Sequence, residues 1–201
     1  MQFTLYSSLS HHLTPSSSWD DLLSSPTSQV LTSPDKASIW WVDVRDPSEE
    51  DVNAVAQTLS IHPLTIEDIV TRETREKVEV FRDYYLISFQ TLVEREDDIG
   101  KEESRAPALG EVYILVFESG TVTFSPSGCG HVARVRERVR KLHDPAVLSS
   151  DWICYAIMYF LFLFSFFSPA SPNKPPLTSA ATTLSTPSPP TCKPPNSNLK
   201  P

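Results

Sequence analysis

The sequence predicts an α/β domain in which helices cover a mixed sheet, followed by a disordered C-terminal tail. Two observations indicate the domain: short runs of β-branched and aromatic residues alternate with runs at helical spacing, and they do so without strict βαβ repetition. A third indicates the tail. Proline is concentrated after Ser168, where no aspartate, glutamate or glycine occurs, and such a segment buries too little apolar surface to offset the entropy of ordering it.

The first region, residues 1 to 38, begins with a short strand at residues 2 to 8. The rest of it is rich in Ser, Thr and Pro, so we expect a loosely ordered connection with one helical turn at residues 19 to 23. His11 and His12 have no further ligands nearby, which favours a solvated loop over a metal site.

The second region, residues 39 to 158, opens with a strand at residues 39 to 44 that is apolar enough to be buried on both faces. A helix follows, because Asp46 or Ser48 can cap it and Pro47 suits its first turn. Its apolar residues recur at helical spacing: Val52, Val55, Ala56 and Leu59.

A second, short helix is expected where Pro63 fits the first position. His62 precedes it, and a lone histidine without companion ligands favours a structural role as the cap or pivot between the two helices. The acidic pair Glu67 and Asp68 should point away from the buried side, which we assign to Leu64, Ile66, Ile69 and Val70.

Three further strands are predicted, at residues 84 to 93, 111 to 117 and 121 to 125. The charged residues 94 to 107 form a loop between the first two, and Ser119-Gly120 permits a tight hairpin turn between the last two.

A basic helix completes the pattern, with apolar residues Val132, Val135, Val139 and Leu142 on one face. Its basic residues favour a solvated face, although they could also meet phosphate, lipid headgroups or acidic loops: Arg134, Arg136, Arg138, Arg140 and Lys141.

Residues 152 to 167 are uncharged, but this run is shorter than the roughly 20 apolar residues of a membrane-spanning helix. The pattern favours a buried helix to about Met158. Phe, Leu, Ser and Pro, which pyrimidine-rich codons specify, dominate the third region, residues 159 to 201. We therefore interpret this region as the product of an unspliced intron or a shifted frame.

Composition and motifs exclude several classes of function. The net charge of −8 argues against nucleic-acid binding, which needs clustered positive charge. The three cysteines lie far apart and indicate neither a disulfide framework nor a metal site. Nucleotide-binding loops, nucleophile elbows and zinc-protease motifs are absent, so we do not expect an enzyme. Asp68 could attract a hard cation such as Mg²⁺, but one carboxylate alone binds weakly.

Five blocks in order carry a family resemblance: "WWVDV", "HPLTIEDI", "REKVEVFRDYY", "EVYILVFESGTVTF" and "SDWICYAIM". Together they resemble the cytoplasmic N-terminal domain of the CorA family of magnesium and divalent-cation channels, in its fungal branch. The resemblance covers residues 39 to 158 well and residues 2 to 38 loosely.

The resemblance implies a homopentamer of subunits that each carry an α/β cytosolic domain, a stalk helix and two transmembrane helices. The family's Gly-Met-Asn filter does not occur in this sequence, so we expect no conduction by this chain alone. The resemblance also implies a regulatory Mg²⁺ between neighbouring domains, with Asp68 as ligand, Glu67 beside it and a partner carboxylate on the next subunit's stalk.

The interpretation is therefore the regulatory cytosolic domain of a CorA-like magnesium transporter whose parent lies in a membrane, whereas this chain alone is expected in the cytoplasm. Its expected partners are other CorA-like subunits and Mg²⁺ or other divalent cations, with no nucleic acid. Two alternatives remain: an interaction module that joins or inhibits full-length subunits, and a peripheral membrane or phosphate-binding protein that uses residues 134 to 141.

Overall fold

The computed structural model describes residues 2–32, 38–93, 108–141 and 148–167, which build one seven-stranded mixed sheet. The strand order is β2-β1-β3-β7-β6-β5-β4, and every neighbouring pair is antiparallel except β3 and β7. The strands are β1 (Gln2–Ser7), β2 (Leu13–Ser16), β3 (Trp40–Arg45), β4 (Lys77–Val80), β5 (Tyr84–Val93), β6 (Ala108–Phe117) and β7 (Gly120–Ser125).

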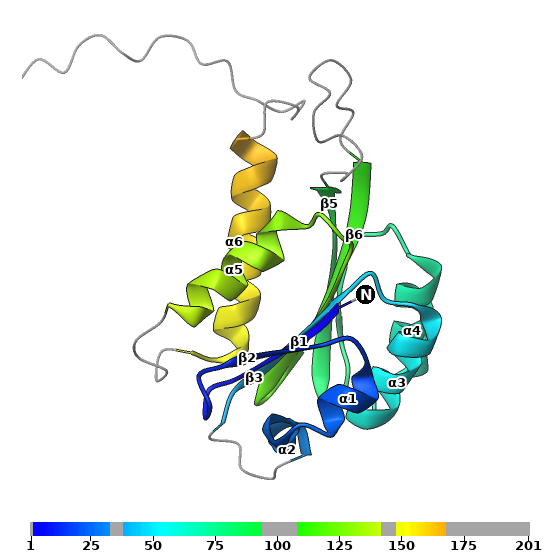
Figure 1. The fold of residues 1–201 in the computed structure, drawn as a ribbon. Helices are drawn as coiled ribbons and strands as arrows, with labels where there is room; N and C mark the ends of the chain where they lie inside the picture. Colours follow the sequence, from blue (N-terminus) through cyan, green and yellow to red (C-terminus); the bar gives the residue numbers. More distant parts are fainter. Residues whose placement is uncertain (1, 33–37, 94–107, 142–147, 168–201) are drawn as a thin grey trace, which may run out of the picture.

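Helices cover both faces of this sheet (Figure 1). One face carries α1 (Trp19–Leu23), α3 (Glu49–Leu59) and α4 (Pro63–Thr71), and the other carries α5 (Gly130–Arg140) and α6 (Ser150–Phe167). The short elements η1 (Pro26–Ser28) and α2 (Gln29–Thr32) follow α1. The predicted class, a mixed sheet covered by helices, is confirmed.

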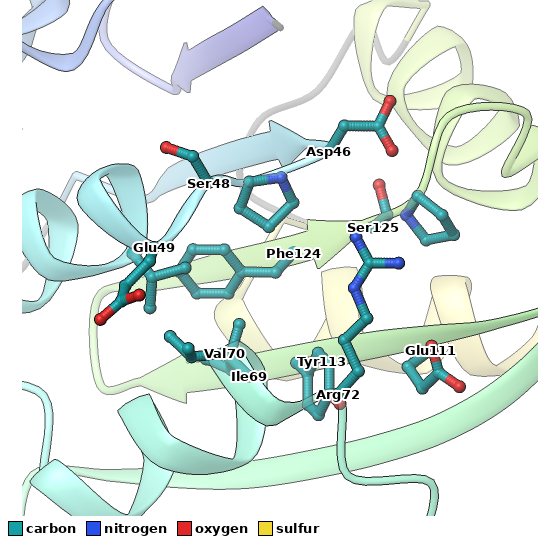
Figure 2. A pocket seen from close by; sticks show the side chains of 13 residues that line it. Asp46, Ser48, Glu49, Ile69, Val70, Arg72, Glu111, Tyr113, Phe124 and Ser125 are labelled. Atoms are coloured by element: carbon teal, nitrogen blue, oxygen red, sulfur yellow. The ribbon is translucent and has the colours of Figure 1, made fainter.

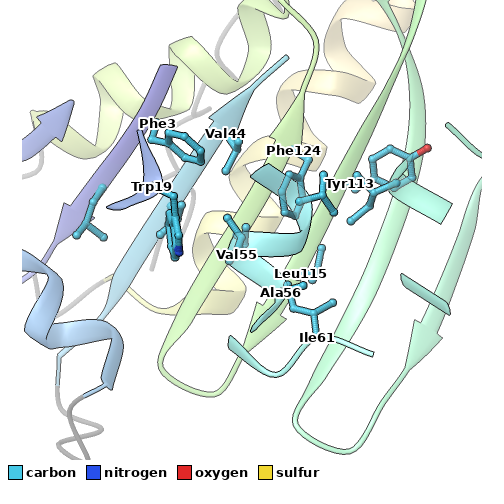
Figure 3. Close-up of a cluster of buried hydrophobic side chains, with 14 of the residues drawn as sticks. Phe3, Trp19, Val44, Val55, Ala56, Ile61, Tyr113, Leu115 and Phe124 are labelled. Atoms are coloured by element: carbon cyan, nitrogen blue, oxygen red, sulfur yellow. The ribbon is translucent and has the colours of Figure 1, made fainter. Parts of the chain in front are cut away.

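The alternation of side chains along each strand divides the core into two clusters. Trp40 points to the cluster under α1, α3 and α4, while its neighbour Trp41 points to the cluster under α5 and α6. Figure 3 shows the first cluster, in which Phe3, Val44 and Phe124 of the sheet meet Trp19 and Val55 of the helices. The sheet is therefore buried on both faces, as predicted for residues 39 to 44.

The hairpin between β6 and β7 is confirmed, and it shows why residue 120 is a glycine. A Cβ atom on Gly120 would lie 2.0 Å from the indole ring of Trp40. The glycine therefore allows the close approach of the Trp40 ring, since any larger residue would push this ring out of the core.

Three segments differ from expectation. Residues 11 to 32 are not a loose connection, because β2 pairs with β1 at the sheet edge and α1 packs on the core; only the helical turn at residues 19 to 23 is confirmed. Residue Pro15 fits β2 because an edge strand tolerates a residue without an N–H donor. Strand β4 was not expected at all.

Helix α6 does not end near Met158 but runs to Phe167, since no proline or glycine interrupts the sequence before Pro169. Residues 94 to 107 and 168 to 201, and the predicted helix residue Leu142, lie outside the described residues. The division of the chain at residues 38/39 and 158/159 stays a prediction.

Candidate functional site

The first turn of α4 is built by His62 and Pro63, as predicted. The imidazole Nδ1 of His62 accepts a hydrogen bond from the Leu64 N–H at 3.2 Å, and Pro63 occupies the first helical position. A side-chain acceptor at the N-cap satisfies one of the free N–H groups at the start of a helix. His62 thus acts structurally, and its ring lies 5.1 Å from that of Phe81.

Tyr84 of β5 fixes this turn against the sheet. Its hydroxyl oxygen accepts a hydrogen bond from the His62 N–H at 3.0 Å and lies 2.8 Å from Oγ1 of Thr65. Thr65 is fully buried, whereas Leu64 is 56% exposed. The predicted burial of Leu64 is wrong, because the Tyr84 hydroxyl draws Thr65 to the inner side of the first turn.

The carboxylate of Asp68 is already paired. The Nζ atom of Lys77, on β4, lies 2.8 Å from Oδ2 of Asp68 and 3.2 Å from Oε1 of Glu79. The hydrogen bond to Asp68 is the largest cause of the raised pKa of Lys77. The Asp68 side chain is only 15% exposed, so β4 covers the carboxylate and supplies its counter-ion.

Glu67 and Asp68 do not converge on one point. Glu67 is exposed, while Asp68 turns toward β4, because successive residues of a helix project about 100° apart. Within the described ranges, no group of three or more His, Cys, Asp or Glu side chains could hold a metal ion. The arrangement is one mostly covered carboxylate bound to one lysine ammonium group.

A second ion pair, which sequence reasoning missed, lies inside the molecule. The Nη1 atom of Arg136 on α5 is 2.8 Å from Oδ2 of Asp43 on β3, and the Asp43 side chain is 2% exposed. The Thr123 hydroxyl donates to the other carboxylate oxygen at 2.9 Å and accepts from the indole N–H of Trp41. Burial raises the pKa of Asp43, and Arg136 and Thr123 offset part of that effect.

The sequence did contain a signal for this pair. Asp43 interrupts an otherwise apolar buried strand, and Arg136 falls between Val132, Val135 and Val139 on the inner stripe of its helix. An acidic and a basic residue that both fall at buried positions are expected to form an ion pair, because burying an unpaired charge costs free energy.

The pairing of Arg136 leaves the basic helix with fewer free cations than the sequence indicates. Arg140 and Lys141 both contact Glu137, at 2.7 and 3.7 Å. Arg134 and Arg138 are exposed, and neither makes an ion pair with any residue that the structure describes. The phosphate- or lipid-binding alternative therefore rests on two arginines.

Among the residues that the structure describes, the remaining reactive side chains show no assembled site. His11 and His12 are exposed, as expected of a solvated loop. Cys129 and Cys154 are buried free thiols, and burial raises the pKa of both, that of Cys154 to about 11, so both stay protonated at neutral pH. Cys192 lies outside the described residues.

Helix α6 shows how the apolar run is used. Ile153, Ile157 and Leu161 are buried against the sheet, and Tyr155 and Tyr159 stack on its outer side with centroids 6.2 Å apart. Among the helices of the described ranges, none combines the length and the apolar character that crossing a bilayer requires.

Comparison with known proteins decides the family. Residues 36–163 match the family described as CorA-like Mg²⁺ transporter protein. The chain belongs to this family. Two CorA-like relatives from Saccharomyces cerevisiae are the magnesium transporter ALR2, 45% identical over 119 residues, and the magnesium transporter ALR1, 44% identical over 119 residues. Both alignments cover 59% of this chain but only 13% of the relative.

A solved structure shares the fold of this chain. The structure of the full-length CmaX protein aligns with a TM-score of 0.56 over 80% of this chain and 44% of that chain. At 7% sequence identity this likeness concerns the fold alone.

Proposed function

We propose that this chain serves magnesium transport as a cation-responsive regulatory domain of a CorA-like transporter. The observation that carries the proposal is the family match over residues 36–163. In this proposal the domain lies at the cytoplasmic face of the membrane that holds its parent, where it assembles with other CorA-like subunits. The sequence contains no Gly-Met-Asn, and the proposal includes that the chain does not conduct alone.

Asp68, with Glu67 beside it, is the proposed Mg²⁺ ligand. The Lys77 ammonium, 2.8 Å from Asp68, occupies the position that a hydrated cation would take. Magnesium keeps most of its waters and needs only one or two carboxylates, so it can replace an ammonium group at a carboxylate near the edge of the sheet. A second acidic surface from a neighbouring subunit would complete the site, and binding would then hold the two subunits together.

A Mg²⁺ titration of the full chain followed by amide NMR tests this proposal. We expect millimolar Mg²⁺ to shift resonances of α4 in the wild-type chain and not in Asp68→Asn. Lys77→Met should bind more tightly, by up to about fivefold, because the competing ammonium is removed. Asp20→Asn, which changes an exposed aspartate of α1, is the matched control.

The titration overturns the regulatory role if neither the wild-type chain nor Lys77→Met responds to Mg²⁺, or if Asp20→Asn loses the response as Asp68→Asn does. A separate assay addresses conduction. Expression of the chain in cells that lack magnesium uptake should not restore growth, and restored growth would show that the chain conducts.

An interaction module is the second candidate, favoured by exposed apolar side chains. Val78 and Val80 are 65% and 83% exposed on the edge strand β4, and Tyr155 is 66% exposed on α6. An edge strand and an aromatic surface are both suited to protein contacts. Co-purification with a co-expressed full-length CorA-like transporter, reduced by Val80→Ser with Tyr155→Ser, would support this role; unchanged recovery of the variant would contradict it.

A further inference from the structure

A pocket of about 280 Å³ lies between α3, α4 and the sheet, apart from the Asp68–Lys77 pair (Figure 2). It opens where β3 and β7 end, and it is lined by the residues that follow β3, by the end of β7 and by the last turn of α4. Its volume is near the lower end of the roughly 300–1,000 Å³ of small-molecule sites, so it suits a small metabolite.

The topology favours a binding site at this position. Strands β3 and β7 are adjacent and parallel, with Arg45 opposite Ser125 at their carboxyl ends. The chain leaves β3 for α3 on one face of the sheet and leaves β7 for α5 on the other face. A crevice forms outside the carboxyl ends of two parallel strands when their connections diverge in this way, and ligands of open α/β sheets bind in such crevices.

Charges of opposite sign line the pocket without neutralising one another. Arg72, at the end of α4, extends its guanidinium toward Ser125 and Asp46, while Glu49 and Glu111 lie on opposite sides of the pocket (Figure 2). Neither Arg72, Glu49 nor Glu111 makes an ion pair with any part of the chain that the structure describes. An unpaired cation and unpaired anions around one pocket complement a ligand that carries both signs.

The backbone holds Arg72 in this position at a cost. Its φ angle is 53°, in the left-handed region that glycine normally occupies at the end of a helix. Asp46, across the pocket, also has a positive φ, 45°, and its Oδ1 accepts a hydrogen bond from the Ser127 N–H at 2.8 Å. Such non-glycine residues are often found at ligand sites, and two of the four in the described ranges line the pocket, while His11 and Ser60 lie outside it.

The floor of the pocket is apolar. It is formed by Val52 of α3, Ile69 and Val70 of α4, and Phe124 of β7. An apolar floor with separated charges at the rim fits a small molecule that has a short hydrocarbon body, a carboxylate and an ammonium group.

We propose that this pocket binds a small zwitterion of the α-amino-acid class, with its carboxylate on Arg72 and its ammonium group on Glu111. The body of the ligand packs on Val52 and Phe124. The site is independent of the magnesium-responsive role proposed above, because its residues do not include Asp68, Glu67 or Lys77.

Three matched probes test the proposal on the wild-type full chain without any substitution and without divalent cations. L-Valine carries both charges, isobutylamine lacks the carboxylate, and 3-methylbutanoate lacks the ammonium group. We expect L-valine to shift the amide resonances of the pocket residues saturably, and each analogue to bind at least about tenfold more weakly, the loss expected for one charge-assisted hydrogen bond.

Substitutions then assign the two charges. Arg72→Gln should weaken the binding of L-valine about tenfold, and Glu111→Gln should weaken it by a similar factor. Binding of 3-methylbutanoate, which has no ammonium group, should be weakened by Arg72→Gln and unchanged by Glu111→Gln. Arg134→Gln and Glu50→Gln change exposed residues outside the pocket by the same charge and should leave L-valine binding unchanged.

Two results overturn the proposal. One is the absence of any saturable shift with L-valine up to its solubility. The other is equal affinity for L-valine and for either analogue, since this would show that the pocket recognises only one of the two charges. A response of the wild-type chain to L-valine with no response to Mg²⁺ would support this site and contradict the magnesium-responsive role, so the two proposals fail separately.

Discussion

Two aspartates each hold a cation at 2.8 Å, but their surroundings differ. Asp43 is buried in the sheet, where Arg136 and Thr123 satisfy both carboxylate oxygens. Asp68 lies at the edge of the sheet, where its side chain is 15% exposed, and it is paired with Lys77 of an edge strand, whose side chain is 20% exposed. The proposed regulatory role requires that Lys77 can be exchanged for another cation from solvent, whereas removing Arg136 leaves a buried charge. The same distance thus joins a pair whose carboxylate is fully enclosed in one place and a pair at the sheet edge, proposed to be exchangeable, in the other.

The largest effect is expected where the buried pair is broken. Arg136→Met should lower the free energy of unfolding by about 3–5 kcal/mol, since Asp43 would keep its charge without a counter-ion. Urea denaturation measures this. Arg134→Met, an exposed position on the same helix, should stay within about ±0.5 kcal/mol of the wild-type chain. Equal effects of the two substitutions would mean that the buried pair does not anchor α5.

The pH dependence of Arg136→Met sharpens the comparison. Burial raises the folded-state pKa of Asp43, so the folded state binds more protons and stability falls as pH rises through that pKa. Without Arg136 the pKa rises further. The stability deficit of Arg136→Met should therefore shrink as pH falls from about 8 to about 5, and adding Asp43→Asn should remove this dependence. A deficit that is constant with pH would contradict the assignment to Asp43.

A smaller effect is expected at the support of α4. Tyr84→Phe should lower the free energy of unfolding by about 1–3 kcal/mol, because the buried Thr65 hydroxyl and the His62 N–H lose their hydrogen-bond partner. Thermal unfolding measures the loss. Tyr155→Phe, which removes an exposed hydroxyl, is the control and should change stability little. If both substitutions were neutral, the Tyr84 hydroxyl would not hold the helix start.

Removal of the His62 N-cap of α4 should lower the free energy of unfolding by about 1 kcal/mol. His62→Ala deletes the Nδ1 acceptor for the Leu64 N–H, whereas His62→Asn supplies another acceptor at the same N-cap and should recover most of the loss. Urea denaturation of the two variants makes the comparison. Equal destabilisation by both would assign the role of His62 to its ring contact with Phe81 instead.

The smallest effect is expected at the Asp68–Lys77 pair on the edge of the sheet. Lys77→Met should change the free energy of unfolding by about 0–1 kcal/mol, and high salt should remove most of the difference. A loss as large as that of Arg136→Met would show that Lys77 is an anchor and not an exchangeable counter-ion, and would remove the physical basis for metal exchange at Asp68.

Much of the fold followed from local pattern. The apolar strand β3, the capped starts of α3 and α4 and the β6–β7 hairpin were predicted because each is set by residues close in sequence; Ser48, one of the two caps considered, forms the capping box of α3 with Asp51. The edge strands were missed. Strand β4 alternates Lys77 and Glu79 with valines and reads as part of a charged turn, and β2 contains Pro15.

The sites were less predictable than the fold. Sequence reasoning assigned His62 correctly because an N-cap is a local feature. It could not show that Asp68 meets Lys77, nine residues later, since β4 had not been recognised. The pocket was not foreseen, because its walls come from residues 46 to 49, 69 to 72, 111 to 113 and 124 to 126, which only the sheet topology brings together.

The parallel pairing of β3 with β7 has a consequence for biosynthesis. Trp40 pairs with Gly120, so the edge of β3 that faces β7 has no partner until about 80 further residues have been translated, which takes about 4 to 16 s at roughly 5–20 residues per second. During that interval the nascent chain exposes a valine- and tryptophan-rich strand edge. Chaperone capture on the ribosome is therefore expected to protect the segment from Trp40 to Arg45 until β7 arrives.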